Sequence, residues 1–274
     1  MKMINKMLTP MSKERKKYLN NIKKEKVLVL FTQIFILVAF IVAWEWLANK
    51  NIIDSFITSQ PTRIWQTFTN LGANDLLKHI QVTVYETIVG FLLGTFLGII
   101  IAIILWWSKF LAKVADPYLV VLNSLPKVAL GPVIIIWVGA GTPAIIVMAI
   151  AISLIVTILE NLNGFLRTDE NLIKMAKTFN ASKLQILTKV VIPANLSTFI
   201  NSLKVNIGLS LVGVISGEFL VSKAGLGYLI VYGGQVFKLD LVMTSVIILG
   251  IVAGLMYAAV ILLEKFILHS RKFR

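Results

Sequence analysis

Long apolar stretches alternate with short polar segments along the whole chain. Six of these stretches are long and apolar enough to cross a membrane as helices. They cover residues 27–48, 83–107, 117–138, 144–159, 197–221 and 241–268. The pattern therefore predicts an all-α, polytopic membrane protein with six transmembrane helices.

The third stretch is interrupted. Pro126 and Pro132 lie inside it, with Lys127 between them. Each proline removes a backbone donor and disfavours helix just before it. A broken helix survives at membrane depth only where it lies against protein or lines a wet cavity. The stretch is thus a candidate for the lining of a pathway, with a simple kink as the alternative.

Small residues recur on one face of the second stretch. Gly90, Gly94 and Gly98 are spaced by four, a pattern that lets another helix approach closely. Gly250 and Gly254 form a second small-residue face in the sixth stretch. We interpret both patterns as helix-packing surfaces.

The polar segment between the fourth and fifth stretches carries two short amphipathic helices joined by a turn. In the first helix one face is apolar and the other is basic. The apolar residues are Leu172, Ile173, Ala176 and Phe179, and the basic residues are Lys174 and Lys177. Asn180 follows, and asparagine tolerates the left-handed conformation that ends a helix.

The second short helix begins with the capping-box pattern of Ser182 and Gln185. Leu184 adds apolar contact, and Pro193 marks the entry to the next span. Such a helix pair, held at the membrane surface, can press on a partner protein. An ordinary amphipathic loop lying on the bilayer explains the pattern equally well.

Composition and charge place the chain in the lipid bilayer and set its orientation. It has 274 residues, of which 57% are hydrophobic and 15% charged, and a soluble protein of this length cannot hide so much apolar surface. The net charge of +14 does not indicate nucleic acid, because the basic residues flank apolar spans. Both chain ends and the segments 108–114 and 160–196 hold most of the 27 Lys and Arg, so we expect them to be cytoplasmic.

The predicted spans and the charge pattern divide the chain into four regions. Residues 1–26 are a basic cytoplasmic arm, short and amphipathic or mobile, which serves as an orientation signal rather than as an anionic-lipid site. Residues 27–80 hold the first transmembrane helix and an extracytoplasmic segment, residues 81–270 the core domain, and residues 271–274 a basic cytoplasmic tail.

The sequence offers no catalytic machinery of its own. It contains no P-loop, HExxH or GxSxG pattern in a plausible context, so we expect neither ATP binding by this chain nor enzyme activity. It has no cysteine, and its two histidines, His79 and His269, lie far apart. We predict no catalytic residue, no metal site and no cofactor.

A few polar residues fall within the predicted spans. Ionisable residues at membrane depth are costly and usually face a bundle interior or a cavity. The candidate pathway residues are Ser124, Pro126, Lys127, Lys204, Asn206 and Glu218. Lys204 and Glu218 are about 21 Å apart along their helix, so they are not partners, and snorkelling to the two interfaces is the alternative for both. Glu86 lies near the outer end of its span, where we expect it to face water.

The polar segment resembles the loop of the membrane-spanning permease subunits of bacterial ABC importers, with the nitrate, sulfonate and taurine type as the closest group. That group also includes thiamine-precursor permeases. The family pattern is E-A-A, three residues, G, nine residues, I-x-L-P. The matching positions are Lys174, Met175, Ala176, Asn180, Val190, Ile192 and Pro193. Lys174 replaces an acidic residue and reverses the charge offered to a partner, and Asn180 replaces glycine.

Further stretches resemble the same group, in the same order, over roughly residues 80–270. They are Ser124-Leu125-Pro126, Gly131-Pro132, Trp137-Val138-Gly139-Ala140-Gly141, Ser202-Leu203-Lys204, Glu218 and Gly225-Leu226-Gly227-Tyr228. Lys204 stands in the place of the family's arginine, and Glu218 in that of its span-five glutamate.

The resemblance implies a permease subunit of an ATP-driven importer in the bacterial cytoplasmic membrane. Two permease copies, expected to be a homodimer, would surround the pathway, and separate cytoplasmic ATPase subunits would bind ATP and Mg. An extracytoplasmic binding protein would deliver a small solute of the sulfonate, taurine, nitrate or thiamine-precursor type. The ATPase-coupling residues would be Lys174, Met175, Ala176, Phe179, Asn180, Ala181, Leu184 and Pro193. The alternative is an ATP-independent secondary transporter or channel, although we find no inverted repeat between the halves.

Overall fold

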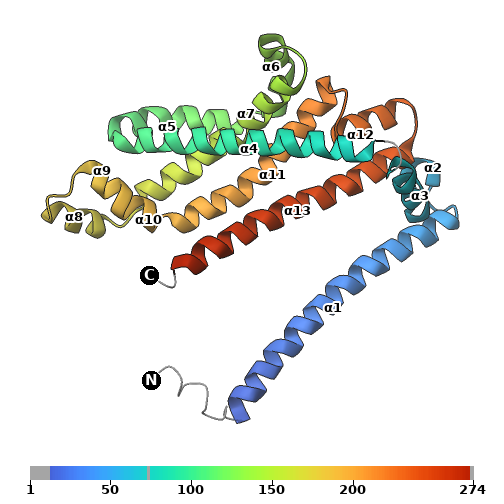
Figure 1. Cartoon of the computed structure of the whole chain (residues 1–274), viewed down its shortest axis with the longest axis horizontal. Helices are drawn as coiled ribbons and strands as arrows, with labels where there is room; N and C mark the ends of the chain where they lie inside the picture. The colour runs from blue at the N-terminus through green and yellow to red at the C-terminus, as the bar shows by residue number, and fades with distance from the viewer. Residues whose placement is uncertain (1–12, 73–74, 272–274) are drawn as a thin grey trace. The chain divides into compact units, whose positions relative to one another are not determined.

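The computed structural model describes residues 13–72 and 75–271, and every regular element in these ranges is a helix (Figure 1). The chain divides into two compact units, Met1–Ile64 and Trp65–Arg274. The second unit contains the polar segment and all but the first of the long apolar helices.

The first unit is dominated by α1, Lys13–Asn49. The span predicted at 27–48 is therefore part of a longer helix that includes residues 13–26, which we had expected to be a separate arm; residues 1–12 lie outside the described ranges. Beyond α1, the short helix α2, Ser55–Thr58, is capped by Asp54, and α3, Pro61–Gly72, follows. Glu45 accepts hydrogen bonds from the Thr62 hydroxyl at 2.7 Å and amide at 3.1 Å, which ties the end of α1 to the start of α3.

The second unit is a series of long helices with short ones at their ends. The long helices are α4, Leu76–Trp107; α5, Lys109–Ser124; α7, Thr142–Leu166; α11, Leu196–Val221; and α13, Leu239–Arg271. Between them lie η2, Lys127–Leu130; α6, Gly131–Val138; α8, Glu170–Thr178; α9, Lys183–Ile186; η3, Leu187–Val191; α10, Ile192–Ala194; and α12, Leu226–Gln235. Figure 1 shows α8 and α9 at one end of the long helices and α12 at the other.

The described residues contain five helices that are long and apolar enough to span a membrane, and a sixth span if one bent pair is counted. That pair joins α5 to η2–α6 across a bend of 88°. The break predicted in the third stretch is confirmed, and it falls at Leu125 and Pro126. Pro132 does not interrupt a helix, because it lies in the first turn of α6, where its missing N–H costs nothing.

The core of the second unit is the stack of α4, α7 and α11, with α7 in contact with both neighbours. A Cβ atom built on Gly90 would lie 2.5 Å from Cβ of Ala149, and one on Gly98 would lie 2.6 Å from Cβ of Thr157. The glycine ridge of α4 thus packs directly on α7, as its spacing predicted.

The opposite side of α7 meets α11 just as closely. A Cβ on Gly213 would lie 2.5 Å from the Ala149 Cα, and a Cβ on Gly217 would lie 3.0 Å from the Ile145 Cα. Ala149 therefore contacts small residues on both sides. The second small-residue face, Gly250 and Gly254, meets no atom within 4 Å in the described chain, so the packing predicted there is not made within it.

Candidate functional site

The polar segment after α7 forms the two short helices that the sequence predicts. Asp169 caps α8 by accepting a hydrogen bond from the Asn171 amide at 2.8 Å. At the other end Asn180 is left-handed, with φ of 54°, as expected. The Ala181 amide donates to the Ala176 carbonyl at 3.1 Å and the Asn180 amide to the Lys177 carbonyl at 2.9 Å. These two hydrogen bonds form the Schellman motif, which fixes the direction in which the chain leaves α8.

The second short helix starts with the predicted capping box. The Ser182 hydroxyl accepts from the Gln185 amide at 3.3 Å, and the Gln185 side-chain oxygen accepts from the Ser182 amide at 2.7 Å. The chain then continues through the wide π turn η3 into α10, where Pro193 occupies the first turn. The turn between α8 and α9 is therefore defined by local hydrogen bonds at both of its ends.

The segment is fixed to the long helices by buried contacts. Ile186, Leu187 and Val191 are buried in a cluster with Phe165 of α7. The buried side-chain amide of Asn195 donates to the Thr168 hydroxyl at 2.8 Å and to the Val191 carbonyl at 2.9 Å. Both ends of the segment are thus held against the end of α7.

The apolar face expected on the first short helix is divided between two environments. Ile173 and Ala176 pack against the buried cluster, whereas Leu172 and Phe179 are exposed. The amphipathic helix predicted here is confirmed, and the buried cluster covers only part of its apolar face. With Met175 and Leu184, the exposed residues form a surface that we call the outer apolar face; the exposed fractions are 40% for Leu172, 55% for Met175, 79% for Phe179 and 58% for Leu184.

Three candidate pathway residues lie at the bend between α5 and α6. Ser124 ends α5, Pro126 precedes η2 and Lys127 begins it. The Lys127 ammonium donates to the Asn123 carbonyl at 3.1 Å, and the Ser124 hydroxyl donates to the Val120 carbonyl at 3.0 Å. Ser124 and Pro126 are exposed and Lys127 is partly exposed in the single chain, so the break presents its polar groups outward.

Lys204 has a partner within the chain. Its ammonium lies 2.7 Å from a carboxylate oxygen of Glu264 on α13, and both side chains are about one-fifth exposed, at 21% and 23%. This ion pair joins α11 to α13, a role that neither of the two interpretations of Lys204 included.

Exchanging the charges of Lys204 and Glu264 tests whether the ion pair itself, rather than the charge at either position, stabilises the chain. Lys204→Glu places two carboxylates together and should destabilise the folded chain by about 2 kcal/mol, between the values for exposed and buried pairs. The double variant Lys204→Glu/Glu264→Lys should recover most of that loss. Thermal unfolding in detergent measures both, and a double variant no more stable than the single one would show that the pair does not stabilise the chain.

Asn206 lies in the interior of the three-helix stack. It is fully buried, and its side-chain amide donates to the hydroxyl of Thr157 on α7 and, at 3.3 Å, to that of Thr95 on α4. The residue thus links all three helices, and in the single chain it has no open surface.

Glu218 organises the opposite end of the stack from α8. It is 1% exposed and accepts from the Thr83 hydroxyl at 2.6 Å and from the Gly227 amide at 2.5 Å. Thr83 in turn accepts from the Leu226 amide at 2.8 Å. Gly225, with φ of 116°, lies so close to the Glu218 carboxylate that no side chain would fit there. Glu218 thus holds α4 and the start of α12 against α11.

Glu86 was expected to face water, and this expectation was wrong. It is 1% exposed. It lies on the face of α4 that also carries Thr83, Gly90 and Gly94, and this face packs inside the unit. Glu86 was assigned by its depth along the span, but its position around the helix decides its environment.

The sequence matches, over residues 94–271, the family described as the binding-protein-dependent transport system inner membrane component. The chain belongs to this family. It is therefore a multi-pass ABC permease component of the inner membrane and not itself the catalytic subunit. The resemblance found in the loop and its flanking stretches is confirmed.

Two relatives agree with this assignment, and one solved structure shares the fold. A protein of Haemophilus influenzae, provisionally described as an ABC transporter permease, is 31% identical over 240 residues, which cover 87% of this permease and 97% of the relative. A Bacillus subtilis protein with the provisional name of aliphatic sulfonates transport permease is 28% identical over 238 residues, 86% of each chain. The inward-facing MetNI methionine ABC transporter shares the fold with a TM-score of 0.61 at 20% identity, covering 68% of this permease and 92% of that chain.

Several residues that organise this permease were missed in the sequence. The Thr83 hydroxyl donates a hydrogen bond to Glu218, and the hydroxyls of Thr95 and Thr157 accept hydrogen bonds from Asn206. The His79 ring accepts a hydrogen bond from the Gly225 amide at 3.0 Å and stacks on Tyr228. The two threonines of α4 lie near the glycine ridge, so small polar residues beside a small-residue ridge are the signal that could have indicated them.

Proposed function

We propose that this ABC importer permease couples to its ATPase subunits through the outer apolar face of α8 and α9. The observation that carries the proposal is the exposure of Leu172, Met175, Phe179 and Leu184 on a segment whose other side is packed against the long helices. Large apolar side chains exposed together on a rigid element are typical of a protein–protein interface. The basic residues of this segment favour the cytoplasmic side, where ATPase subunits bind ATP and Mg.

The way the segment is held supports its role in transmitting force. The capping box and the Schellman motif fix α8 relative to α9, and Asn195 and the buried cluster fix both to α7 and α11. A movement imposed on α8 would therefore reach the stack of α4, α7 and α11. In the proposed mechanism, ATP binding closes the ATPases and turns the pathway outward, and hydrolysis resets it.

The pathway itself is proposed to form between two copies of this permease. The bend between α5 and α6 presents Ser124 and Lys127 outward, and Ile136 and Trp137 of α6 are each 80% exposed. A second copy would cover these apolar side chains and enclose the polar bend. Lys204, Asn206 and Glu218 are engaged in contacts between helices, so within this proposal they support the pathway walls.

The substrate is proposed to be a small sulfonate-type anion delivered by an extracytoplasmic binding protein. Support comes from the sulfonate permease name of the Bacillus subtilis relative.

Reconstitution tests the function directly. The permease is purified in mild detergent from its native host, and co-purifying proteins are identified by mass spectrometry. We expect an ATPase with Walker motifs in about equal amount, and uptake of a sulfonate into liposomes that requires ATP. Uptake by the permease alone, without ATPase or ATP, would contradict the proposal and identify a secondary transporter or channel.

A further inference from the structure

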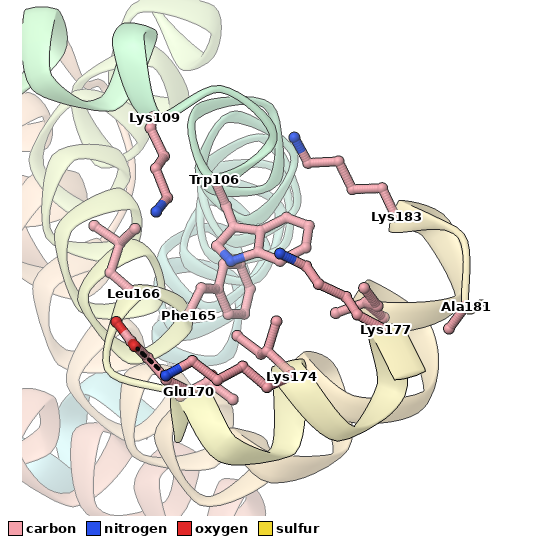
Figure 2. Close-up of a pocket in the computed structure, with 12 residues that line it drawn as sticks. Trp106, Lys109, Phe165, Leu166, Glu170, Lys174, Lys177, Ala181 and Lys183 are labelled. Atoms are coloured by element: carbon pink, nitrogen blue, oxygen red, sulfur yellow. Dashed lines mark ion pairs between the residues drawn. The ribbon is translucent and has the colours of Figure 1, made fainter. Parts of the chain in front are cut away.

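A cavity of about 630 Å³ lies behind α8, on the side that faces the long helices. The ends of α4 and α7, the start of α5 and the helices α8 and α9 all contribute to it. Trp106 and Phe165 provide an aromatic wall, and four lysines are among the other lining residues (Figure 2). Its volume is within the range of sites that hold small molecules.

The cavity carries an excess of positive charge. Lys109, Lys174, Lys177 and Lys183 line it, against the one carboxylate of Glu170. Glu170 pairs with Lys174 at 3.4 Å, as Figure 2 shows. Lys183 donates to the Trp107 carbonyl and lies 5.4 Å from the centre of the Trp107 ring. Within residues 13–72 and 75–271, Lys109 and Lys177 have no ion-pair partner.

The cavity is separate from the proposed ATPase surface. Its residues on α8 are Glu170, Ile173, Lys174 and Lys177, which share one helix face by their spacing of three and four. Leu172, Met175 and Phe179 of the outer apolar face lie on the opposite side of the helix. An ATPase bound to the outer apolar face would therefore leave the cavity to another ligand.

The position and lining of the cavity indicate what that ligand is. Trp106 and Trp107 end a 32-residue apolar helix, and tryptophan at such a position is typical of the membrane–water interface. Basic pockets between membrane helices at this level suit anionic headgroups, and the apolar wall suits the carbon atoms next to them. Lysine binds phosphate through its positive charge and its three donors.

We propose that this cavity binds a phosphate group between Lys109 and Lys177, presented by an anionic phospholipid headgroup or by free phosphate. Lys109 belongs to α5 and Lys177 to α8, and Figure 2 shows both side chains beside Trp106. A bound phosphate group bridges the two helices and holds α8 against the ends of α4 and α5. The ligand thereby stabilises the segment from the side opposite the ATPase.

Thermal unfolding of the purified permease in neutral detergent tests the site, with any ATPase that co-purifies left in place. The ligands are phosphatidylglycerol, phosphatidylcholine and inorganic phosphate, with sodium chloride at matched ionic strength as a control for screening. A ligand that binds only the folded protein raises its thermal midpoint. The variant is Lys109→Gln/Lys177→Gln, and the matched control is Lys113→Gln/Lys189→Gln, which removes the same charge from exposed lysines that do not line the cavity.

We expect phosphatidylglycerol or inorganic phosphate to raise the midpoint of the wild type and of the control, whereas chloride does not. The cavity variant should bind at least about tenfold more weakly, because two charge-assisted contacts are lost. A rise with phosphatidylglycerol alone identifies the headgroup as the source, and a rise with inorganic phosphate as well identifies the free anion.

An equal rise in the cavity variant, or no rise with either ligand in the wild type, would overturn the proposal. So would a cavity variant that loses its ATPase while its response to both ligands stays normal, because the lysines would then belong to the ATPase interface. Failure of coupling through the outer apolar face leaves the site unaffected, since those residues lie on the other side of α8.

Discussion

Gly213→Ala is expected to destabilise the folded permease severely. The added Cβ would lie 2.5 Å from the Ala149 Cα and 3.0 Å from its backbone nitrogen, so α7 and α11 must move apart. Backbone atoms cannot rotate away as a flexible side chain can, and overpacking of this kind costs about 3 kcal/mol. The measurement is the thermal midpoint of the protein in detergent, which should fall by roughly 10 °C.

Gly208→Ala on the same helix is the matched control. Its added Cβ would meet nothing within 4 Å in the described chain, and alanine favours helix over glycine. The control should be as stable as the wild type or slightly more stable. Equal midpoints for the two variants would show that the close contact between α7 and α11 does not limit stability.

The double variant Met175→Asp/Phe179→Asp is expected to abolish ATP-driven uptake and leave the permease folded. Both side chains are mostly exposed, at 55% and 79%, so the charges cost little in the isolated chain. At an interface with the ATPase, loss of each apolar anchor costs about 2 kcal/mol and each buried carboxylate adds to the penalty. ATPase co-purification and uptake into liposomes are the two measurements, and both should fall to background.

Asn171→Asp serves as the control, because it adds a carboxylate to an exposed position of the same helix outside the outer apolar face. It should retain the ATPase and normal uptake. Normal ATP-driven uptake by the double variant, at wild-type expression, would exclude the outer apolar face as the coupling surface.

Local features of the polar segment could be predicted from the sequence because they depend on residues close together in the chain. Asn180 in the left-handed conformation, the capping box of Ser182 and Gln185, and the break near Pro126 all follow from short-range backbone sterics and hydrogen bonds. The apolar stretches likewise predicted the spans, although the helices extend beyond the ranges expected: α1, α4 and α5 begin seven or more residues earlier, and α7 and α13 are longer at both ends.

Contacts between distant helices could not be predicted in the same way. Lys204 and Glu264 are 60 residues apart, and nothing near either residue indicates the other. The burial of Glu86 depends on which side of α4 faces α7. The lysine cavity combines residues of five helices, and Lys109 and Lys177 line one cavity only in the folded chain. Hydropathy gives the depth of a residue in the membrane, but the rotation of its helix and its contact partners depend on how the helices pack.

Ala149 has a consequence for how sequences of this kind can diverge. It meets Gly90 through its Cβ and Gly213 through its backbone. A larger side chain at 90 or at 149 therefore separates α4 from α7, whereas the room at 213 is set by the backbone of α7 whatever side chain position 149 carries. Substitutions at 90 and 149 should therefore be coupled in evolution, and an alignment of related permeases should show position 213 staying small independently of both.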